Sequence, residues 1–193
     1  MTVFIGDVHG KCDRYHQIIR EHSDTIQVGD MGIGFVDCFP LKEMINGNHR
    51  FIRGNHDNPF ECINNSQWIK DGCVENDMMF MGGAYSIDKA YRTPGRDWWP
   101  EEELSYPELT QMIDIYIVTK PRIMVTHDAP LFLTAELYPT SNILTRTGQA
   151  LQYMFEIHRP ESWVFGHHHI SLDVTILGTR FVCLAELETK QID

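Results

Sequence analysis

Short apolar runs alternate with longer amphipathic segments along most of this chain. Short apolar runs bounded by glycine, proline, asparagine or aspartate are typical of buried strands. The runs that predict strands are Thr2–Ile5, Ile26–Val28, Phe51–Ile52, Met78–Met81, Ala84–Ile87, Arg122–Thr126, Trp163–Phe165, Leu172–Ile176 and Phe181–Leu184. The last two flank Gly178 and Thr179, which predict a hairpin turn between them. The alternation of strands and helices indicates a layered α/β protein.

Apolar residues at helical spacing separate several of these strands. The longer predicted helices cover Lys11–His22, Glu108–Thr119 and Asn142–His158. Asn58 followed by Pro59 is typical of a helix N-cap and a first-turn proline, and it predicts a short helix through Ile63. The glycines and the terminal proline of Met31–Pro40 indicate a loop, and Leu41–Ile45 is expected to form a helical turn.

Length and composition indicate a single domain, residues 1–193. A chain of 193 residues with 42% hydrophobic and 22% charged residues buries a substantial core on its own. A polar and aromatic segment at about 88–106 is expected to be an insertion in that domain. The sequence has no apolar run of membrane-spanning length and no leader at Met1, so no membrane association and a cytoplasmic location are expected.

Charge and cysteine usage narrow the classes of function. The formal net charge of −11 disfavours stable nucleic-acid binding, which needs Lys and Arg to displace counterions. An acidic protein still holds phosphate when metal ions supply positive charge locally. The cysteines are odd in number, widely spaced and expected to be reduced thiols. They are Cys12, Cys38, Cys62, Cys73 and Cys183.

Five apolar strands each run into a short loop that carries metal-binding side chains. These side chains are Asp7 with His9, Asp30, Asn55 with His56, His127, and His167 with His169. Oxygen and imidazole donors without thiolate suit Mn²⁺, Fe, Ni²⁺, Mg²⁺ or Zn²⁺. So many donors suit two ions that share a carboxylate, and two ions about 3.5–4 Å apart are typical of displacement at phosphorus. Hydrolysis of a phosphate ester is therefore the leading chemistry, and a single-metal site with two histidines and one carboxylate leaves half of these motifs without a purpose.

The tripeptide Gly-Asn-His occurs twice, at Gly47–His49 and Gly54–His56. The first copy precedes the predicted strand Phe51–Ile52 and the second follows it. Ligands gather at the carboxyl ends of strands in layered α/β proteins, so the second copy is selected.

Taken in order, these motifs resemble the calcineurin-like metallophosphoesterase superfamily. The resemblance rests on Gly6-Asp7-Val8-His9-Gly10, Gly29-Asp30, Gly54-Asn55-His56-Asp57, His127 and Gly166-His167-x-His169. It implies a four-layer α-β-β-α sandwich of two mixed β-sheets flanked by helices. It also implies that Asp7, His9 and His169 hold one metal, that Asn55, His127 and His167 hold the other, and that Asp30 bridges them. Manganese is the metal expected.

His56 is the residue expected to donate a proton to the leaving group. A hydroxide that bridges two cations is already deprotonated near neutral pH, so no protein general base is required. A leaving alkoxide needs a proton, and His56 lies beside Asn55 without being assigned to a metal. Asp57 and Asp128 are expected either to orient imidazoles or to cap turns in their loops.

Substrate contacts are expected from Asn55 and from three arginines, Arg53, Arg92 and Arg96. A guanidinium matches the geometry of a phosphate group, although each arginine also suits a solvent-facing position. Trp98 and Trp99 suit either stacking on a substrate ring or anchoring of the insertion. The expected substrate is a small-molecule phosphate ester or a nucleotide, as a monoester or a diester.

The sequence departs from one branch of the superfamily. Protein serine/threonine phosphatases continue the second motif as Gly-Asp-x-Val-Asp-Arg-Gly, whereas this chain has Gly29-Asp30-Met31-Gly32-Ile33-Gly34. This difference disfavours a protein phosphatase or a dinucleoside polyphosphate hydrolase, which remain alternatives to a compact phosphatase or phosphodiesterase. A scaffold that has lost catalysis is a third alternative, disfavoured because His56 and every expected ligand are present.

Overall fold

Two mixed β-sheets form the centre of the computed structural model, which describes residues 2–37, 44, 47–139 and 143–192. The first sheet has the order β10 (Thr189–Gln191), β1 (Val3–Ile5), β2 (Asp24–Gln27), β3 (Asn48–Phe51). The second has the order β4 (Val74–Glu75), β5 (Met78–Met81), β6 (Ile123–Thr126), β7 (Ser162–Phe165), β9 (Thr179–Cys183), β8 (Leu172–Ile176). Strands β1, β2 and β3 are parallel, as are β5, β6, β7 and β9, and the edge strands β10, β4 and β8 are antiparallel to their neighbours.

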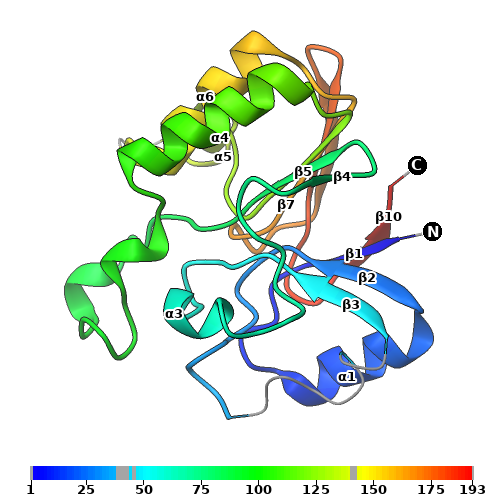
Figure 1. Cartoon of the computed structure of the whole chain (residues 1–193), viewed down its shortest axis with the longest axis vertical. Coiled ribbons are helices and arrows are strands. Elements are labelled where there is room, and N and C mark those ends of the chain that lie inside the picture. Colours follow the sequence, from blue (N-terminus) through cyan, green and yellow to red (C-terminus); the bar gives the residue numbers. More distant parts are fainter. Residues whose placement is uncertain (1, 38–43, 45–46, 140–142, 193) are drawn as a thin grey trace.

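Helices cover the outer face of each sheet. They are α1 (Cys12–Glu21), α3 (Pro59–Cys62), α4 (Tyr106–Thr119), α5 (Leu131–Leu137) and α6 (Arg146–Ile157). Figure 1 shows α4 and α6 beyond the second sheet and α1 beyond the first. The layers therefore follow the order α-β-β-α, as expected.

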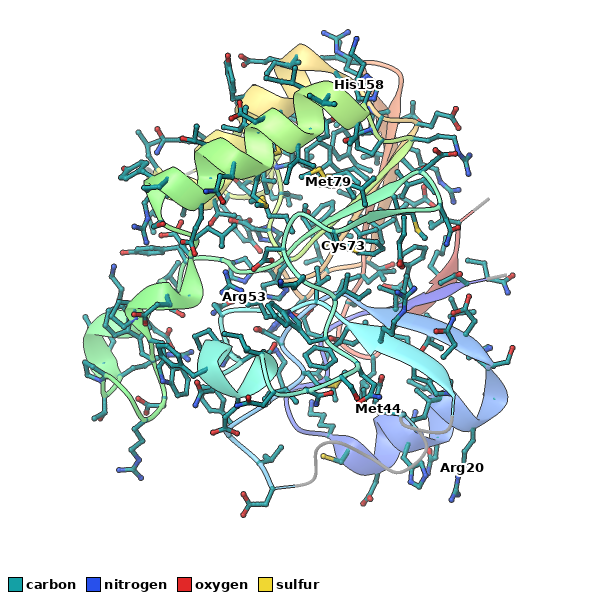
Figure 2. All side chains as sticks on the ribbon, viewed as in Figure 1. Arg20, Met44, Arg53, Cys73, Met79 and His158 are labelled. Carbon is teal, nitrogen blue, oxygen red and sulfur yellow. The ribbon has the colours of Figure 1, made fainter. Side chains whose placement is uncertain are left out.

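Three hydrophobic cores separate the four layers, because successive strand residues point to opposite faces. In β5, Phe80 belongs to the core between the two sheets, whereas Met79 belongs to the core under α4 and α6. In β1, Phe4 faces the second sheet and Ile5 faces α1. Met79 and Met44 mark the two outer cores in Figure 2.

Local signals set the ends of the helices. Ser105 and Glu108 form a reciprocal capping box that starts α4, two residues before the predicted start. Lys120 ends this helix in the left-handed conformation, with φ of 44°. The Asn58 side chain accepts a hydrogen bond from the amide of Phe60 and caps α3, which confirms that prediction.

Some predicted elements differ from the structure. Ala84–Ile87 is not a strand, because the Glu102 carboxylate accepts hydrogen bonds from both the amide and the hydroxyl of Ser86 in place of a strand partner. The sequence also gave no indication of α5, β4 or β10. The turn expected at Leu41–Ile45 lies outside the described residues except for Met44, and α6 begins only at Arg146.

The cysteine expectation holds only in part. Cys62, Cys73 and Cys183 are free thiols. Cys12 is disulfide-bonded, which corrects the expectation of reduced cysteines throughout, and Cys38 lies outside the described residues. No described helix is both long and apolar enough to cross a membrane.

The segment from residue 88 to residue 106 carries only two short 3-10 turns before α4 begins, η1 (Lys89–Tyr91) and η2 (Pro100–Glu102). Figure 1 shows the early part of this segment, in green, projecting to one side of the two sheets. Trp99 is buried and packs edge-on against Phe35, with the ring centroids 5.3 Å apart. We propose that the chain is one domain and that this segment is an insertion anchored by Trp99.

Candidate metal centre

The loops that follow five parallel strands meet at one end of the two sheets. The first sheet contributes Asp7 and His9 after β1, Asp30 after β2, and Asn55 and His56 after β3. The second sheet contributes His127 after β6, and His167 and His169 after β7. Ligand sites at the carboxyl ends of parallel strands are common in α/β folds. The structure thus brings together all seven residues that were expected to bind metal.

One cluster consists of Asp7, His9, Asp30 and His169, whose ligand atoms all lie within 4.8 Å of one another. Nε2 of His9 lies 2.8 Å from Nε2 of His169. Nε2 of His169 lies 3.1 Å from Oδ2 of Asp7, and Nε2 of His9 lies 3.8 Å from Oδ2 of Asp30. Two imidazole nitrogens and two carboxylates therefore point at one location.

A second cluster consists of Asp30, His127 and His167. Nε2 of His127 lies 3.2 Å from Oδ1 of Asp30 and 3.1 Å from Oδ1 of Asn55. Nδ1 of His127 lies 2.8 Å from the backbone oxygen of Val28, which fixes the orientation of the ring. Asp30 is common to both clusters and presents one oxygen to each.

The backbone of these loops is held in unusual conformations. His9, Asp30, His167 and His169 all have positive φ, between 49° and 65°. Left-handed backbone in residues other than glycine is uncommon and concentrates at functional sites. Four of the seven expected ligands therefore occupy a conformation that has no advantage for strand or helix.

A motif glycine makes room for one carboxylate. A Cβ atom at Gly54 would lie 2.0 Å from Oδ1 of Asp30. No side chain fits at that separation, so the close approach of loop and carboxylate requires glycine.

The buried charges favour cation binding. Asp7 and Asp30 are at most 1% exposed. Burial acts to raise the pKa of Asp30, but His127 lowers it well below its usual range. Burial also opposes protonation of His127, yet the Asp30 carboxylate raises the pKa of His127 to about 10. Burial lowers the pKa of His167 to about 4, which leaves this imidazole neutral and able to bind metal at neutral pH.

This set of donors fits two divalent cations. Protonated His127 compensates only one of the two buried carboxylates, whereas bound cations compensate both and leave the imidazole nitrogens free to act as ligands. Nitrogen and oxygen donors without thiolate match Mn²⁺, Fe²⁺, Ni²⁺, Mg²⁺ or Zn²⁺ and do not select among them.

His56 lies beside the metal-binding clusters. Its backbone amide donates a 2.7 Å hydrogen bond to Oδ1 of Asp30, and its ring packs edge-on against His9 at 5.1 Å. Nη2 of Arg92 lies 2.8 Å from Nε2 of His56, and the Arg92 guanidinium also pairs with Asp88. Burial lowers the pKa of His56, Asp30 acts to raise it, and the positive charge of Arg92 lowers it further.

Two of the expected arginines lie away from the site. The Arg53 side chain is buried, and it binds Oδ2 of Asp71 at 2.9 Å and the backbone oxygens of Glu101 and Glu102. Nε and Nη1 of Arg53 are thus engaged inside the protein and Arg53 does not line the cleft described below, which disfavours the expected contact with substrate. Arg96 is exposed and does not line the cleft described below.

Asp57 has a structural position. Its carboxylate accepts hydrogen bonds from four backbone amides, those of Met31, Gly32, Ile33 and Gly54. These bonds tie the loop after β2 to the loop after β3. Of the two roles expected for Asp57, these bonds match the capping of turns, here in the loops that carry Asp30 and Asn55.

Two residues that the sequence did not indicate hold Asn55 in place. Nδ2 of Asn55 donates to Oγ of Ser86 at 3.0 Å, and Oγ of Ser86 donates to Oε2 of Glu102 at 2.5 Å. This chain of hydrogen bonds directs Oδ1 of Asn55 toward His127. Ser86 and Glu102 come from the segment between β5 and α4, and no local pattern links them to Asn55.

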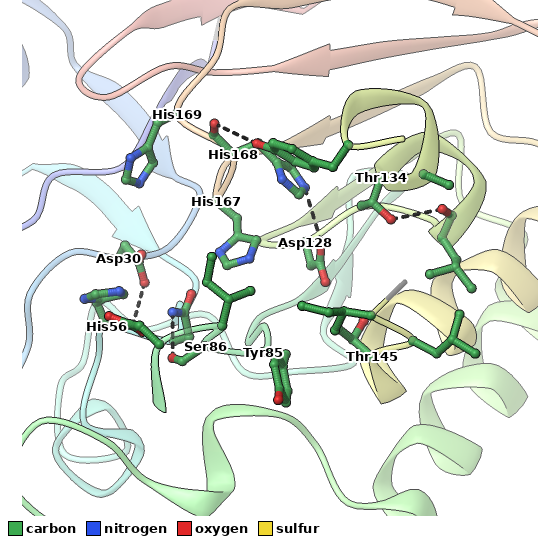
Figure 3. A pocket seen from close by; sticks show the side chains of 18 of the residues that line it. Asp30, His56, Tyr85, Ser86, Asp128, Thr134, Thr145, His167, His168 and His169 are labelled. Atoms are coloured by element: carbon green, nitrogen blue, oxygen red, sulfur yellow. Dashed lines mark hydrogen bonds and ion pairs between the residues drawn. The ribbon is translucent and has the colours of Figure 1, made fainter. Parts of the chain in front are cut away.

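Asp128 and His168 form a further pair, with 3.3 Å between Nε2 of His168 and Oδ1 of Asp128. Sequence reasoning assigned no role to His168. Both residues line a cleft of about 1150 Å³ that opens beside the metal-binding clusters. Figure 3 shows Asp30, His56, His167 and His169 on one side of this cleft, and Thr134 and Thr145 on the other.

Comparison with known proteins agrees with this arrangement. Residues 2–171 match the model of the family described as calcineurin-like phosphoesterase. The chain belongs to this family. It is thus a hydrolase of the calcineurin-like phosphoesterase family. No curated protein matched in a separate comparison.

Solved structures of several hydrolases share the fold. The chain is similar to a dimetal phosphatase from Danio rerio, with a TM-score of 0.57, 12% identity, and coverage of 96% of this chain and 88% of that one. A phosphopantetheinyl hydrolase from Mycobacterium tuberculosis gives a TM-score of 0.53, 13% identity, and coverage of 96% and 89%. A 5'-nucleotidase, described as putative, from Staphylococcus aureus gives a TM-score of 0.56, 14% identity, and coverage of 96% of this chain and 48% of that one.

Proposed function

We propose that this calcineurin-like phosphoesterase hydrolyses small phosphate esters at a centre that binds two divalent metal ions. The observation that carries the proposal is the position of Asp30, whose carboxylate belongs to both clusters of potential ligands. A shared carboxylate is the usual way to hold two ions about 3.5–4 Å apart. The fold is also that of a protein described as a dimetal phosphatase.

Asp7, His9 and His169 would hold one ion, Asn55, His127 and His167 the other, and Asp30 would bridge them. When bound, the ions supply positive charge for the phosphate oxygens and an activated water as nucleophile. We propose Mn²⁺ as the native ion, with Fe, Ni²⁺, Zn²⁺ or Mg²⁺ as alternatives that the same donors accept.

His56 supplies the proton for the leaving group. Hydrolysis forms a bond from the water oxygen to phosphorus and breaks the bond from phosphorus to the leaving oxygen, which then takes up a proton. Burial and Arg92 lower the pKa of His56, so its protonated form is a stronger acid but the minor form near neutral pH. Arg92 orients the His56 ring and offers its guanidinium to the phosphate, and Asn55 also lies within reach of substrate at the edge of the cleft.

The first experiment measures release of p-nitrophenol from p-nitrophenyl phosphate and from methyl p-nitrophenyl phosphate with each metal in turn. Turnover with Mn²⁺ is expected, and its preference between the two substrates decides between monoesterase and diesterase activity. Absence of turnover with all five metals would refute the proposal. Asn55→Ala is expected to impair the rate, whereas Asn48→Ala, from the other Gly-Asn-His copy on β3, is the matched control.

The role of His56 is tested with His56→Ala. This variant is expected to keep two bound metals and to lose rate by about 10²–10⁴ on alkyl esters, with a smaller loss on the good leaving group p-nitrophenolate. Loss of metal from the variant would instead identify His56 as a ligand. Metal counts on His169→Ala and His167→Ala test the division of ligands, since each is expected to retain about one ion.

We also propose a cytoplasmic location, on the basis of the free thiols of Cys62, Cys73 and Cys183. The disulfide at Cys12 argues against this location. Fractionation of cells that express the protein tests it, and recovery outside the cytoplasmic fraction would contradict it.

A further inference from the structure

The cleft extends far beyond the space that a phosphate group needs. Its volume of about 1150 Å³ exceeds the roughly 300–1,000 Å³ that is typical of small-molecule sites. The metal-binding clusters occupy one side of it (Figure 3). The remainder lies between residues 85–88, which follow β5, and residues from 131–138, 143–145 and α6. Its apolar lining includes Ile87, Leu131, Phe132, Ala135, Ile143 and Leu144.

Several of these apolar side chains are exposed to solvent. Ile87 is 77% exposed, Leu144 is 68% exposed and Ile143 is 43% exposed. They come from two separate segments of the chain yet line the same cleft. Exposed apolar side chains that gather at one place indicate a binding surface, because water contact with this area is unfavourable until a ligand covers it.

The polar side chains of the same wall already have partners within the protein. Oε1 of Gln152 accepts a hydrogen bond from the amide of Phe132, and the Thr145 hydroxyl accepts one from the amide of Gly148 at the start of α6. The Thr134 hydroxyl donates to the backbone oxygen of Leu131. These groups support the wall, and the surface left for a ligand is mainly apolar.

The charges of the cleft disfavour polyanions. Among the described residues that line it, Arg92 is the only arginine or lysine, and it lies beside His56, where the proposed function assigns it to the phosphate at the metal-binding clusters. The carboxylates of Asp88 and Asp128 lie along the same cleft. A second phosphate outside the metal-binding clusters would therefore meet carboxylates with no free cation among these residues.

We propose that the substrate is a phosphate ester with an uncharged, largely apolar organic group, which lies against Ile87, Leu131 and Leu144 while the phosphate lies at the metal-binding clusters. This inference rests on the proposed function, because it places the phosphate at that centre. It adds the chemical class of the group that the phosphate carries.

The test measures binding of alkylphosphonates, which the enzyme does not hydrolyse, to the Mn²⁺-loaded protein by titration calorimetry. The series runs from methylphosphonate to hexylphosphonate. Kd is expected to fall about twofold to fourfold for each methylene, and so at least about 30-fold from methyl to hexyl. A Kd that does not change along the series would overturn the inference. Tighter binding of a dinucleoside tetraphosphate than of hexylphosphonate would also overturn it.

Turnover of p-nitrophenyl phosphate, measured in parallel, reports on the proposed function separately. If the protein is active but binds all phosphonates with equal affinity, the inference about the substrate class is refuted and the proposed function stands. If the protein is inactive but its affinity rises with chain length, the apolar site stands and the proposed hydrolytic function is refuted.

Matched variants locate the apolar site. Leu144→Gln and Ile87→Gln change exposed side chains, so folding is expected to survive, as circular dichroism can check. Each variant is expected to weaken the binding of hexylphosphonate at least about fivefold more than the binding of methylphosphonate. This difference corresponds to the loss of one to two buried methylenes. The control is Val118→Gln, which changes an 82% exposed apolar side chain on α4 that does not line the cleft. Equal effects of Leu144→Gln and Val118→Gln would overturn the placement.

Discussion

Replacement of Arg53 by methionine tests whether this residue holds the fold or contacts the substrate. The Arg53 side chain is 5% exposed and its partner Asp71 is 12% exposed. Nε of Arg53 lies 2.9 Å from Asp71, and Nη1 donates to the backbone oxygens of Glu101 and Glu102 at 2.9 and 3.0 Å. These contacts join the loop after β3 to the end of the insertion, and Arg53 does not line the cleft.

The expected cost follows from these contacts. Methionine keeps most of the apolar volume of arginine but leaves Asp71 buried without its cation, and removal of one partner of a buried pair costs about 3–5 kcal/mol. In a protein of this size each kcal/mol lowers Tm by about 2–4 °C, so a decrease of about 6–20 °C is expected. Asp71 keeps a hydrogen bond from the amide of Gly82, which favours the lower part of this range.

Thermal unfolding followed by circular dichroism measures the change, with Arg96→Met as the matched control. Arg96 is exposed, so its replacement is expected to change the free energy of unfolding by no more than about 0.5 kcal/mol. The double variant Arg53→Met/Asp71→Leu is expected to recover part of the loss, because neither charge is then left unpaired. An Arg53→Met protein with the Tm of the control and a raised KM for aryl phosphate would show that Arg53 contacts substrate after all.

Three further predictions concern the metal-binding clusters. Ser86→Ala removes the acceptor that holds Asn55, so metal affinity is expected to fall about 10- to 100-fold in a metal titration. An unchanged affinity would show that Asn55 is held without Ser86. Gly54→Ala places a Cβ atom against the Asp30 carboxylate, so this variant is expected to retain fewer than two ions when assayed by mass spectrometry. Two retained ions would mean that the loop moves to make room for the Cβ atom. Removal of metal with a chelator is expected to lower the free energy of unfolding by about 2.7 kcal/mol for each site that was occupied at a free metal concentration of 100 times its Kd. An unchanged Tm would contradict metal binding.

The candidate metal-binding residues were predictable from the sequence because each one lies in a loop that follows a strand. Asp7, Asp30 and His127 need only an apolar run before them to be placed. Parallel pairing of β1 and β2 brings Asp7 and Asp30 together, and packing of the second sheet on the first adds His127. The hydrophobic pattern was similarly sufficient for most strands of both sheets, but it gave no sign of β4 or β10 and it wrongly predicted a strand at Ala84–Ile87. Thr189–Gln191 has a polar sequence and is a strand through its pairing with β1.

Residues that act through distant partners were not predictable. Arg53 is separated by one residue from Asn55, and the sequence does not show that its side chain turns toward Asp71. Glu102 lies in a run of three glutamates, and only the fold distinguishes it as the acceptor for Ser86. The direction of a loop side chain depends on contacts across 18 to 49 residues of sequence, which local patterns do not contain.

The two sheets contribute different donors to the same centre. Asp7, Asp30 and Asn55 come from the first 55 residues, whereas the donors from the second sheet are complete only when His169 is in place. A chain that is still being synthesised therefore presents three of the four residues of the first cluster, including His9, but only Asp30 and Asn55 of the second. His127, His167 and His169 join them only after the second sheet has docked on the first, so catalytic competence is expected to appear in one late step of folding.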